Sequence, residues 1–164
     1  SNDSLSLGAV PFQMADDHCV VVGAKCTSAA SYPFICALSN NSSTSAGAAD
    51  LFVDAGGFLS GRWKNDAGTA TFQAAGSGVY ANNAPFVATA RKVGSAVAVR
   101  FNGVSSVGGV APTGATTVNR SVIGTGDSLF PGHISAVAIM KATVSDSDLA
   151  LIEKFIGTLN GQTL

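Results

Sequence analysis

The sequence predicts an all-β protein, a two-sheet antiparallel sandwich with one C-terminal helix. Short apolar or alternating segments recur along most of the chain and are separated by Gly, Asn, Pro and Ser, which is typical of strands joined by turns. Only residues 145–161 combine helical spacing with start and stop signals. A chain rich in short strands buries its apolar faces by packing two sheets together, and we expect the helix to dock on an edge.

The predicted strands are short runs of apolar and β-branched residues. Residues 19–25 (CVVVGAK) are apolar throughout, which predicts a central strand. Asn102-Gly103 predicts a type I′ turn, because both central positions need a positive φ. Residues 133–140 alternate little, which predicts burial on both faces. The other predicted strands are 32–38, 49–54 paired with 58–64 in a hairpin, 69–74, 86–93, 96–101, 104–107 and 121–124, with loops at 39–47, 76–85 and 108–114.

One helix is predicted to begin near Ser145. The Ser145 hydroxyl can accept from an early backbone amide, and Asp146 and Asp148 lie at the positive end of the helix dipole. Asn160-Gly161 predicts its end. Its apolar face consists of Leu149, Ile152, Phe155, Ile156 and Leu159, and we expect the first four to pack on the sandwich.

Composition limits the possible partners. The 164 residues predict one domain, residues 1–164, and 46% hydrophobic residues allow a sizeable core. Charged residues make up only 12%, so Ser, Thr, Asn, Gln and Gly must cover much of the surface, which suits sugars or other subunits. The net charge is −1 and the basic residues are scattered, which argues against nucleic acid. No apolar run approaches the roughly 20 residues of a membrane span, so we expect no membrane insertion.

Three cysteines, Cys19, Cys26 and Cys36, occur without a Cys-x-x-Cys pair. Buried apolar thiols are the favoured interpretation, and a Cys26–Cys36 bridge closing a hairpin is the alternative. Asp16-Asp17-His18 could offer metal ligands, but a polar turn before a strand is favoured.

Three passages resemble the concanavalin A-like (laminin-G-like) superfamily. They are residues 97–103, a strand that ends in Asn-Gly; 122–124 followed by 130–134, an "Ile-Gly … Phe-x-Gly-x-Ile" passage; and the helix 144–156. With the matching strands from Cys19 onward, the resemblance covers nearly the whole chain. It implies a jelly-roll sandwich, and the closing helix resembles versions in phage tail and bacterial surface proteins. Calcium is the one cofactor that the resemblance would allow. An acidic residue associated with it in some relatives is replaced by Ser135, so no cofactor or metal is expected.

Catalysis is not expected. Glucanases with this jelly roll use paired carboxylates, usually in Glu-x-Asp-x-x-Glu, whereas this chain has a single glutamate, Glu153, on the predicted helix. No Gly-x-Ser-x-Gly elbow occurs. Residues 76–81 match a relaxed dinucleotide fingerprint, but no helix follows them, so a flexible loop is favoured.

A ligand site is predicted from five residues: Arg62, Trp63, Tyr80, Asn82 and Asn83. The two rings would form the floor under a sugar, and Arg62 with the two Asn would donate or accept directional hydrogen bonds. In an antiparallel meander, the end of strand 58–64 and the loop after the next strand could meet at one rim. Three alternatives remain: Trp63 as a core residue whose indole finds a carbonyl, Tyr80 as a loop anchor, and a regular strand that turns Arg62 and Trp63 to opposite faces.

The sequence therefore predicts a non-catalytic recognition or adhesion module. The expected setting is a phage tail fibre or tailspike that binds a bacterial surface carbohydrate, placed on a virion or an extracellular surface. The alternative is a structural virion or surface protein whose faces are subunit contacts; a degenerate glucanase-like hydrolase comes third. The expected partners are a surface glycan or other subunits of the same assembly, and a homo-oligomer is compatible with either hypothesis.

Overall fold

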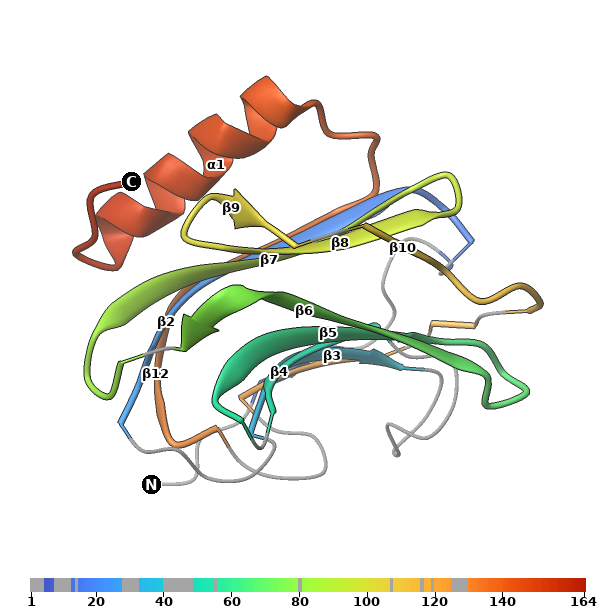
Figure 1. Ribbon diagram of the computed structural model, residues 1–164, viewed down its shortest axis with the longest axis horizontal. Coiled ribbons are helices and arrows are strands. Elements are labelled where there is room, and N and C mark those ends of the chain that lie inside the picture. The colour runs from blue at the N-terminus through green and yellow to red at the C-terminus, as the bar shows by residue number, and fades with distance from the viewer. Residues whose placement is uncertain are drawn as a thin grey trace.

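The fold is a sandwich of two antiparallel sheets with one helix outside it (Figure 1). The computed structural model describes residues 5–7, 13, 15–27, 33–39, 49–54, 56–79, 81–106, 108–115, 117–118, 120–124 and 130–164, with only the backbone of 5–7 and 72–79. Sheet A has the order β1 (Leu5–Leu7), β11 (Arg120–Ile123), β3 (Phe34–Ser39), β4 (Ala49–Val53), β5 (Phe58–Lys64), β6 (Ala70–Val79). Sheet B has the order β10 (Gly109–Val110), β8 (Ala96–Phe101), β7 (Pro85–Val93), β2 (His18–Cys26), β12 (Gly132–Met140), and β9 (Val104–Ser105) pairs with β8. The predicted fold class is confirmed.

The main core fills the space between the sheets. Residues that alternate along each strand point inward from both sheets, as the period of two requires. Trp63 is its largest fully buried side chain. Cys26 and Cys36 belong to the same core as buried free thiols, and Cys19 is also buried and free, so the favoured interpretation of these cysteines is confirmed. The inward-facing members include Val20, Val22, Ala24, Ile35, Leu38, Leu51, Val53, Leu59, Trp63, Phe86, Ala88, Val97 and Val99.

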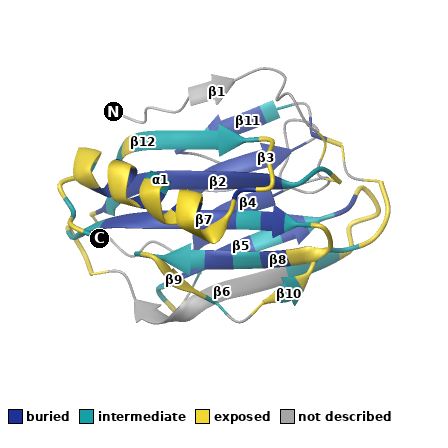
Figure 2. Ribbon diagram, turned by 90° about the horizontal axis from the view of Figure 1, so that it is seen from above, coloured by how far each residue is buried: buried dark blue, intermediate teal, exposed yellow. Residues whose placement is uncertain are grey.

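Sheet B is apolar on its outer face as well. A second cluster of Cys19, Val21 and Val87 lies on that face. The helix α1 (Asp146–Leu159) covers it and packs on β2, β7 and β12. Figure 2 shows α1 lying across the buried strands β2 and β7. The expectation that the helix docks on an edge is therefore wrong. The helix lies on the outer face of sheet B, because that apolar face would otherwise be exposed to water. No helix in the described part of the chain has the length and hydropathy to cross a membrane.

The helix begins where predicted, but it buries a different face. Ser145 is the N-cap, and its hydroxyl accepts from the Asp148 amide at 3.1 Å. Leu149 and Ile156 are buried as expected. Phe155 is 65% exposed, so its predicted packing is wrong. Glu153 lies on the same helical face as Leu149 and Ile156, and it takes the buried place between them.

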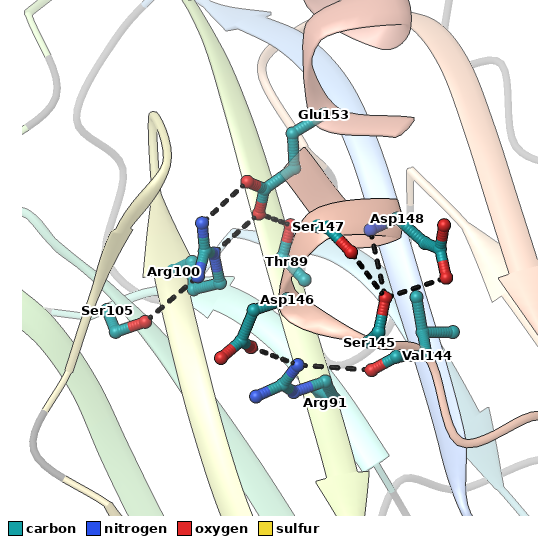
Figure 3. A network of polar contacts seen from close by, with 10 residues as sticks. All are labelled: Thr89, Arg91, Arg100, Ser105, Val144, Ser145, Asp146, Ser147, Asp148 and Glu153. Atoms are coloured by element: carbon teal, nitrogen blue, oxygen red, sulfur yellow. Dashed lines mark hydrogen bonds and ion pairs between the residues drawn. The ribbon is translucent and has the colours of Figure 1, made fainter. Parts of the chain in front are cut away.

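Glu153 is held in that place by polar partners on sheet B (Figure 3). Its carboxylate accepts from Thr89 Oγ1 at 2.7 Å, from Arg100 Nε at 2.9 Å and from Arg100 Nη2 at 3.0 Å. The Glu153 and Arg100 side chains are 2% and 14% exposed. A bidentate ion pair of this kind fixes the relative orientation of the two side chains as well as their distance. It therefore sets the position of α1 along the strands.

Two predictions about strands are wrong: the burial of β12 and the end of β6. The strand β12 is the edge of sheet B, and most of its residues are partly exposed, so burial on both faces is wrong. The strand β6 extends through Gly76–Val79, which the sequence predicts as loop. Val79 pairs with Phe58, beyond an irregularity in the β5–β6 pairing that follows Ala74. The Asn102-Gly103 turn is confirmed, with φ of 51° and 81°.

Glu153→Ala should cost about 3 kcal/mol of unfolding free energy, because it leaves the Arg100 guanidinium buried without its carboxylate. Phe155→Ala is the matched control on the same helix, and we expect a change within about 0.5 kcal/mol because that ring faces solvent. Urea denaturation of both variants measures the difference. Equal losses would contradict the assignment of Glu153 as the residue that fixes the helix.

Candidate binding pocket at the rim of the sandwich

A pocket of about 370 Å³ opens at one rim of the sandwich. It lies where β5 and β7 end and β8 begins, between the β7–β8 hairpin and the segment 111–114. We call it the rim pocket. Its lining residues are Ala15, Trp63, Lys64, Lys92, Gly94, Ser95, Ala111, Pro112, Thr113 and Gly114.

The wall formed by segment 111–114 is held from within the protein. Asn65 is 6% exposed; its Nδ2 donates to the Thr113 carbonyl at 2.6 Å, and its Oδ1 accepts from the Thr69 amide at 2.8 Å. Gly114 has a φ of 110°, which disfavours a side chain there. The Ala111 amide donates to the Ser95 carbonyl at 2.8 Å. These bonds join the pocket wall to β5 and to the β7–β8 hairpin, so the pocket is preformed.

Trp63 and His18 form the buried side of this rim. Trp63 is 1% exposed and His18 is fully buried, and Trp63 Nε1 donates to His18 Nε2 at 3.4 Å. The other ring nitrogen, Nδ1, lies 2.9 Å from the Asp16 carbonyl, which can only accept. His18 is therefore neutral, with its hydrogen on Nδ1. Burial lowers the pKa of His18 to about 4, and the Asp16 carbonyl and nearby Asp17 oppose that shift only in part.

Two carboxylates brace the pocket from outside its lining. Asp17 accepts from Thr143 Oγ1 at 2.5 Å and from the Gly94 amide at 2.7 Å, which fixes the β7–β8 hairpin. The Thr143 hydroxyl is the main cause that lowers the pKa of Asp17. Asp16 accepts from the Gln13 amide, the main cause of its own lowered pKa, and pairs with Lys141 at 3.0 Å. The structure thus shows the favoured polar turn before a strand, and no three potential metal ligands cluster among the residues it describes.

Comparison with protein-family profiles and with curated proteins finds no match. Solved structures do match. The CBM40 domain of a Ruminococcus gnavus sialidase shares 12% identity at a TM-score of 0.70, over 91% of this chain and 98% of that chain. NanB sialidase from Streptococcus pneumoniae shares 14% identity at a TM-score of 0.74; the match covers 92% of this chain and only 26% of the sialidase. Domains LG4-5 of the mouse laminin α1 chain share 13% identity at a TM-score of 0.68, over 89% of this chain and 41% of that chain.

The chain has the concanavalin A-like jelly-roll fold. The jelly-roll fold that the motifs implied is thereby confirmed, and these low identities show the fold alone.

Within this concanavalin A-like sandwich, Arg62 and Trp63 point to opposite faces of sheet A. Arg62 lies on the outer face, where Nε donates to the buried Asp50 at 2.7 Å and the guanidinium carbon lies 5.6 Å from the Phe34 ring centre. Trp63 points into the core. The alternative that a regular strand separates them is what the structure shows. Trp63 cannot serve as an exposed floor for a sugar.

The predicted Asn82 and Asn83 lie at the other end of the sandwich. Both are exposed in a turn, and the Asn83 amide donates to the Cys26 carbonyl, where β2 ends. Because β5 and β6 are antiparallel, Val79 pairs with Phe58 at the start of β5, whereas Trp63 lies near its end. The expectation that these residues meet at one rim is therefore wrong. Tyr80 lies outside the described residues, and ligand contact by any of the five stays a prediction.

Sequence analysis missed Lys64, Lys92 and Asn65. Lys92 follows Arg91 near the end of an apolar strand and is only 7% exposed. The sequence did contain one indication of this residue: a lysine lies within an otherwise apolar strand. A charge in such a place needs a partner or a cavity. Asn65 gave no such signal, since its contact with Thr113 spans 48 residues.

Stability should fall as the pH drops from 6.5 to 4. The His18 pKa is 6.5 in the unfolded chain and about 4 in the folded protein. In this window the unfolded chain binds a proton that the folded protein excludes, so the free energy of unfolding decreases by roughly 3 kcal/mol, and it is unaffected above 6.5. Urea denaturation at pH 7.5, 5.5 and 4.5 measures this. The lowered pKa values of Asp16 and Asp17 also reduce stability as the pH falls, but mainly near and below 3.8, at the lower end of this window.

His18→Gln keeps a donor for the Asp16 carbonyl and an acceptor for Trp63, and it should abolish the pH dependence between 4 and 6.5. His133→Gln, on the exposed part of β12, is the matched control and should retain it. A wild-type stability that is flat across this window would refute the buried neutral state of His18.

Proposed function

We propose that the protein is a non-catalytic carbohydrate-binding module whose ligand enters the rim pocket. The observation that carries this proposal is the preformed pocket of about 370 Å³, which has ammonium, hydroxyl and backbone groups along its lining. A site with fixed walls saves the ordering cost that loops otherwise add to binding. Concave sites with a few placed polar groups are where proteins bind small ligands.

The structural neighbours support this function. The CBM40 domain matches over nearly its whole length, and a second structure of it is bound to α2,3-sialyllactose. Absence of catalysis is supported by Glu153: the one glutamate of the chain is buried under α1 and bound by Arg100 and Thr89. A glycosidase needs a pair of accessible carboxyl groups flanking the bond that it cleaves.

The wider setting is part of the same proposal. We place residues 1–164 as one domain in a phage tail fibre or tailspike, on a virion or an extracellular surface, where it binds a bacterial surface carbohydrate. The closing helix and the charge-poor composition of 12% charged residues support this setting. Fold likeness alone leaves the ligand open, since unrelated functions share one fold.

A two-rim test addresses the function and the position of the site together. Ser95→Trp should block the rim pocket and reduce glycan binding at least tenfold, because Ser95 is exposed at the tip of the β7–β8 hairpin. Asn82→Trp places the same bulk on the opposite rim and should leave binding unchanged. The measurement is a glycan array followed by titration calorimetry with the best-bound glycan. Loss of binding only in Asn82→Trp would move the site to the other rim, and an array without any bound glycan would refute the function.

A second candidate function is a structural role in which the domain contacts a second copy of itself. The outer face of α1 exposes Leu151, Phe155 and Leu159. They follow one another at intervals of four residues, with Phe155 in the middle. Such spacing is self-complementary in an antiparallel, two-fold contact. The three side chains supply only a fraction of the roughly 800 Å² per partner that a stable interface buries, which places this candidate second.

Sedimentation at rising protein concentration separates the two candidates. The structural role requires a dimer that Phe155→Asp dissociates, with Lys154→Gln as a control that changes the net charge by the same one unit on the same helix. The binding role expects a monomer whose glycan binding survives Phe155→Asp. A monomer at every concentration rules out the second candidate.

A further inference from the structure

The lining of the rim pocket is charged with one sign only. Two lysines, Lys64 and Lys92, contribute to it, and none of its ten residues is acidic. The chain as a whole carries a net charge of −1, so the pocket does not simply repeat the average of the surface. A concave site with charge of one sign attracts ligands of the other sign.

Of the two lysines, Lys92 is the stronger indication of an anionic ligand, because its ammonium is buried and has few hydrogen-bond acceptors. The residue is 7% exposed, and Nζ donates to the Ala15 carbonyl at 2.8 Å. An ammonium has three hydrogens, and among the described residues this carbonyl is the one acceptor that it reaches. Two N–H groups of a buried cation therefore remain for a ligand in the pocket.

The nearest carboxylates are committed to other donors. Asp16 is bound by the Gln13 amide and by Lys141, and Asp17 is bound by Thr143 and by the Gly94 amide. Both lie near enough for Lys92 to lower their pKa, although it is a minor cause in each case. They partly balance the charge of Lys92, yet neither lines the pocket. The protein thus keeps the cation in place and leaves its pocket side without an anion.

Lys64 adds a second cation from another element. It ends β5, is partly exposed, and forms no ion pair within the described part of the chain. Ser95 and Thr113 lie in the same lining and offer hydroxyl groups. The combination of two cations with small polar groups suits a sugar ring that carries an acidic substituent.

We infer that the rim pocket selects an anionic saccharide, with its carboxylate or sulfate against Lys92 and Lys64. This inference rests on the proposed function and adds the class of ligand. Because the ammonium of Lys92 is shielded from water, its attraction for an anion is stronger than that of a surface lysine. A neutral sugar can offer hydroxyl oxygens to that ammonium but no opposite charge, so its hydrogen bonds there are weaker than those of a carboxylate or sulfate.

Three probes test the inference by titration calorimetry: α2,3-sialyllactose, lactose 3′-sulfate and lactose. They share the lactose unit and differ in the acidic group. We expect at least tenfold tighter binding of one or both acidic probes than of lactose. The two acidic probes distinguish a carboxylate from a sulfate as the recognised group.

Lys92→Met and Lys64→Met remove each charge while keeping most of the side-chain volume. Each should weaken binding of the acidic probe at least tenfold and so remove its advantage over lactose. Lys154→Met, on the exposed face of α1, is the control with the same change in net charge. Lys64 is partly exposed at a strand end, so its variant keeps the test valid if Lys92→Met fails to fold.

The outcomes separate this inference from the proposed function. Binding of lactose as tight as that of both acidic probes, unaffected by either lysine variant, would overturn the selection for anions and leave a carbohydrate-binding module in place. Binding of an acidic probe that both lysine variants retain would also overturn it, because the charge would then be recognised elsewhere. Failure of every neutral and acidic glycan on an array would overturn the function itself.

Discussion

The structure depends on one constraint, which is that sheet B is apolar on both faces. Its inner face belongs to the main core, and its outer face exposes Cys19, Val21 and Val87 unless something covers them. The helix α1 provides that cover with Leu149 and Ile156. Apolar contact alone has little direction, so the helix could slide along the strands. The Glu153–Arg100 pair removes that freedom, a role in which buried charge contributes specificity more than stability.

Local signals in the sequence predicted the elements that local forces determine. The Asn102-Gly103 turn and the Ser145 cap depend on a few adjacent residues, and both appear where predicted. Local signals could not predict that Glu153, and not Phe155, lies on the buried face of the helix. Hydrophobicity favours burying the ring, but Thr89 and Arg100 lie 64 and 53 residues away along the chain and supply the bonds that bury the carboxylate instead.

The candidate site was harder to predict than the fold because it is assembled from distant segments. Trp63 was placed correctly near the end of its strand, but side-chain direction depends on register, and that register turns it into the core. Lys92 comes from β7 and the opposite wall from segment 111–114, which Asn65 holds across 48 residues. No spacing in the sequence reports such contacts. The general expectation that binding sites lie where strands end and loops begin agrees with the position of the rim pocket.

The lack of an exposed ring in the rim pocket has a consequence for how the protein would act. Trp63 is its one aromatic lining residue and is almost fully buried, so the stacking that commonly supports sugar binding is absent from this lining. Under the proposed function, affinity would then depend on charge and hydrogen bonds in the rim pocket, and salt weakens such contacts. Under the proposed function, we therefore expect a single pocket to bind weakly even though its walls are preformed. Several copies displayed together on one particle would turn weak single contacts into firm attachment, since each further contact forms at a high effective concentration. Under the proposed function, the fold would fix the geometry of each site, and the display of several copies would supply the strength of attachment.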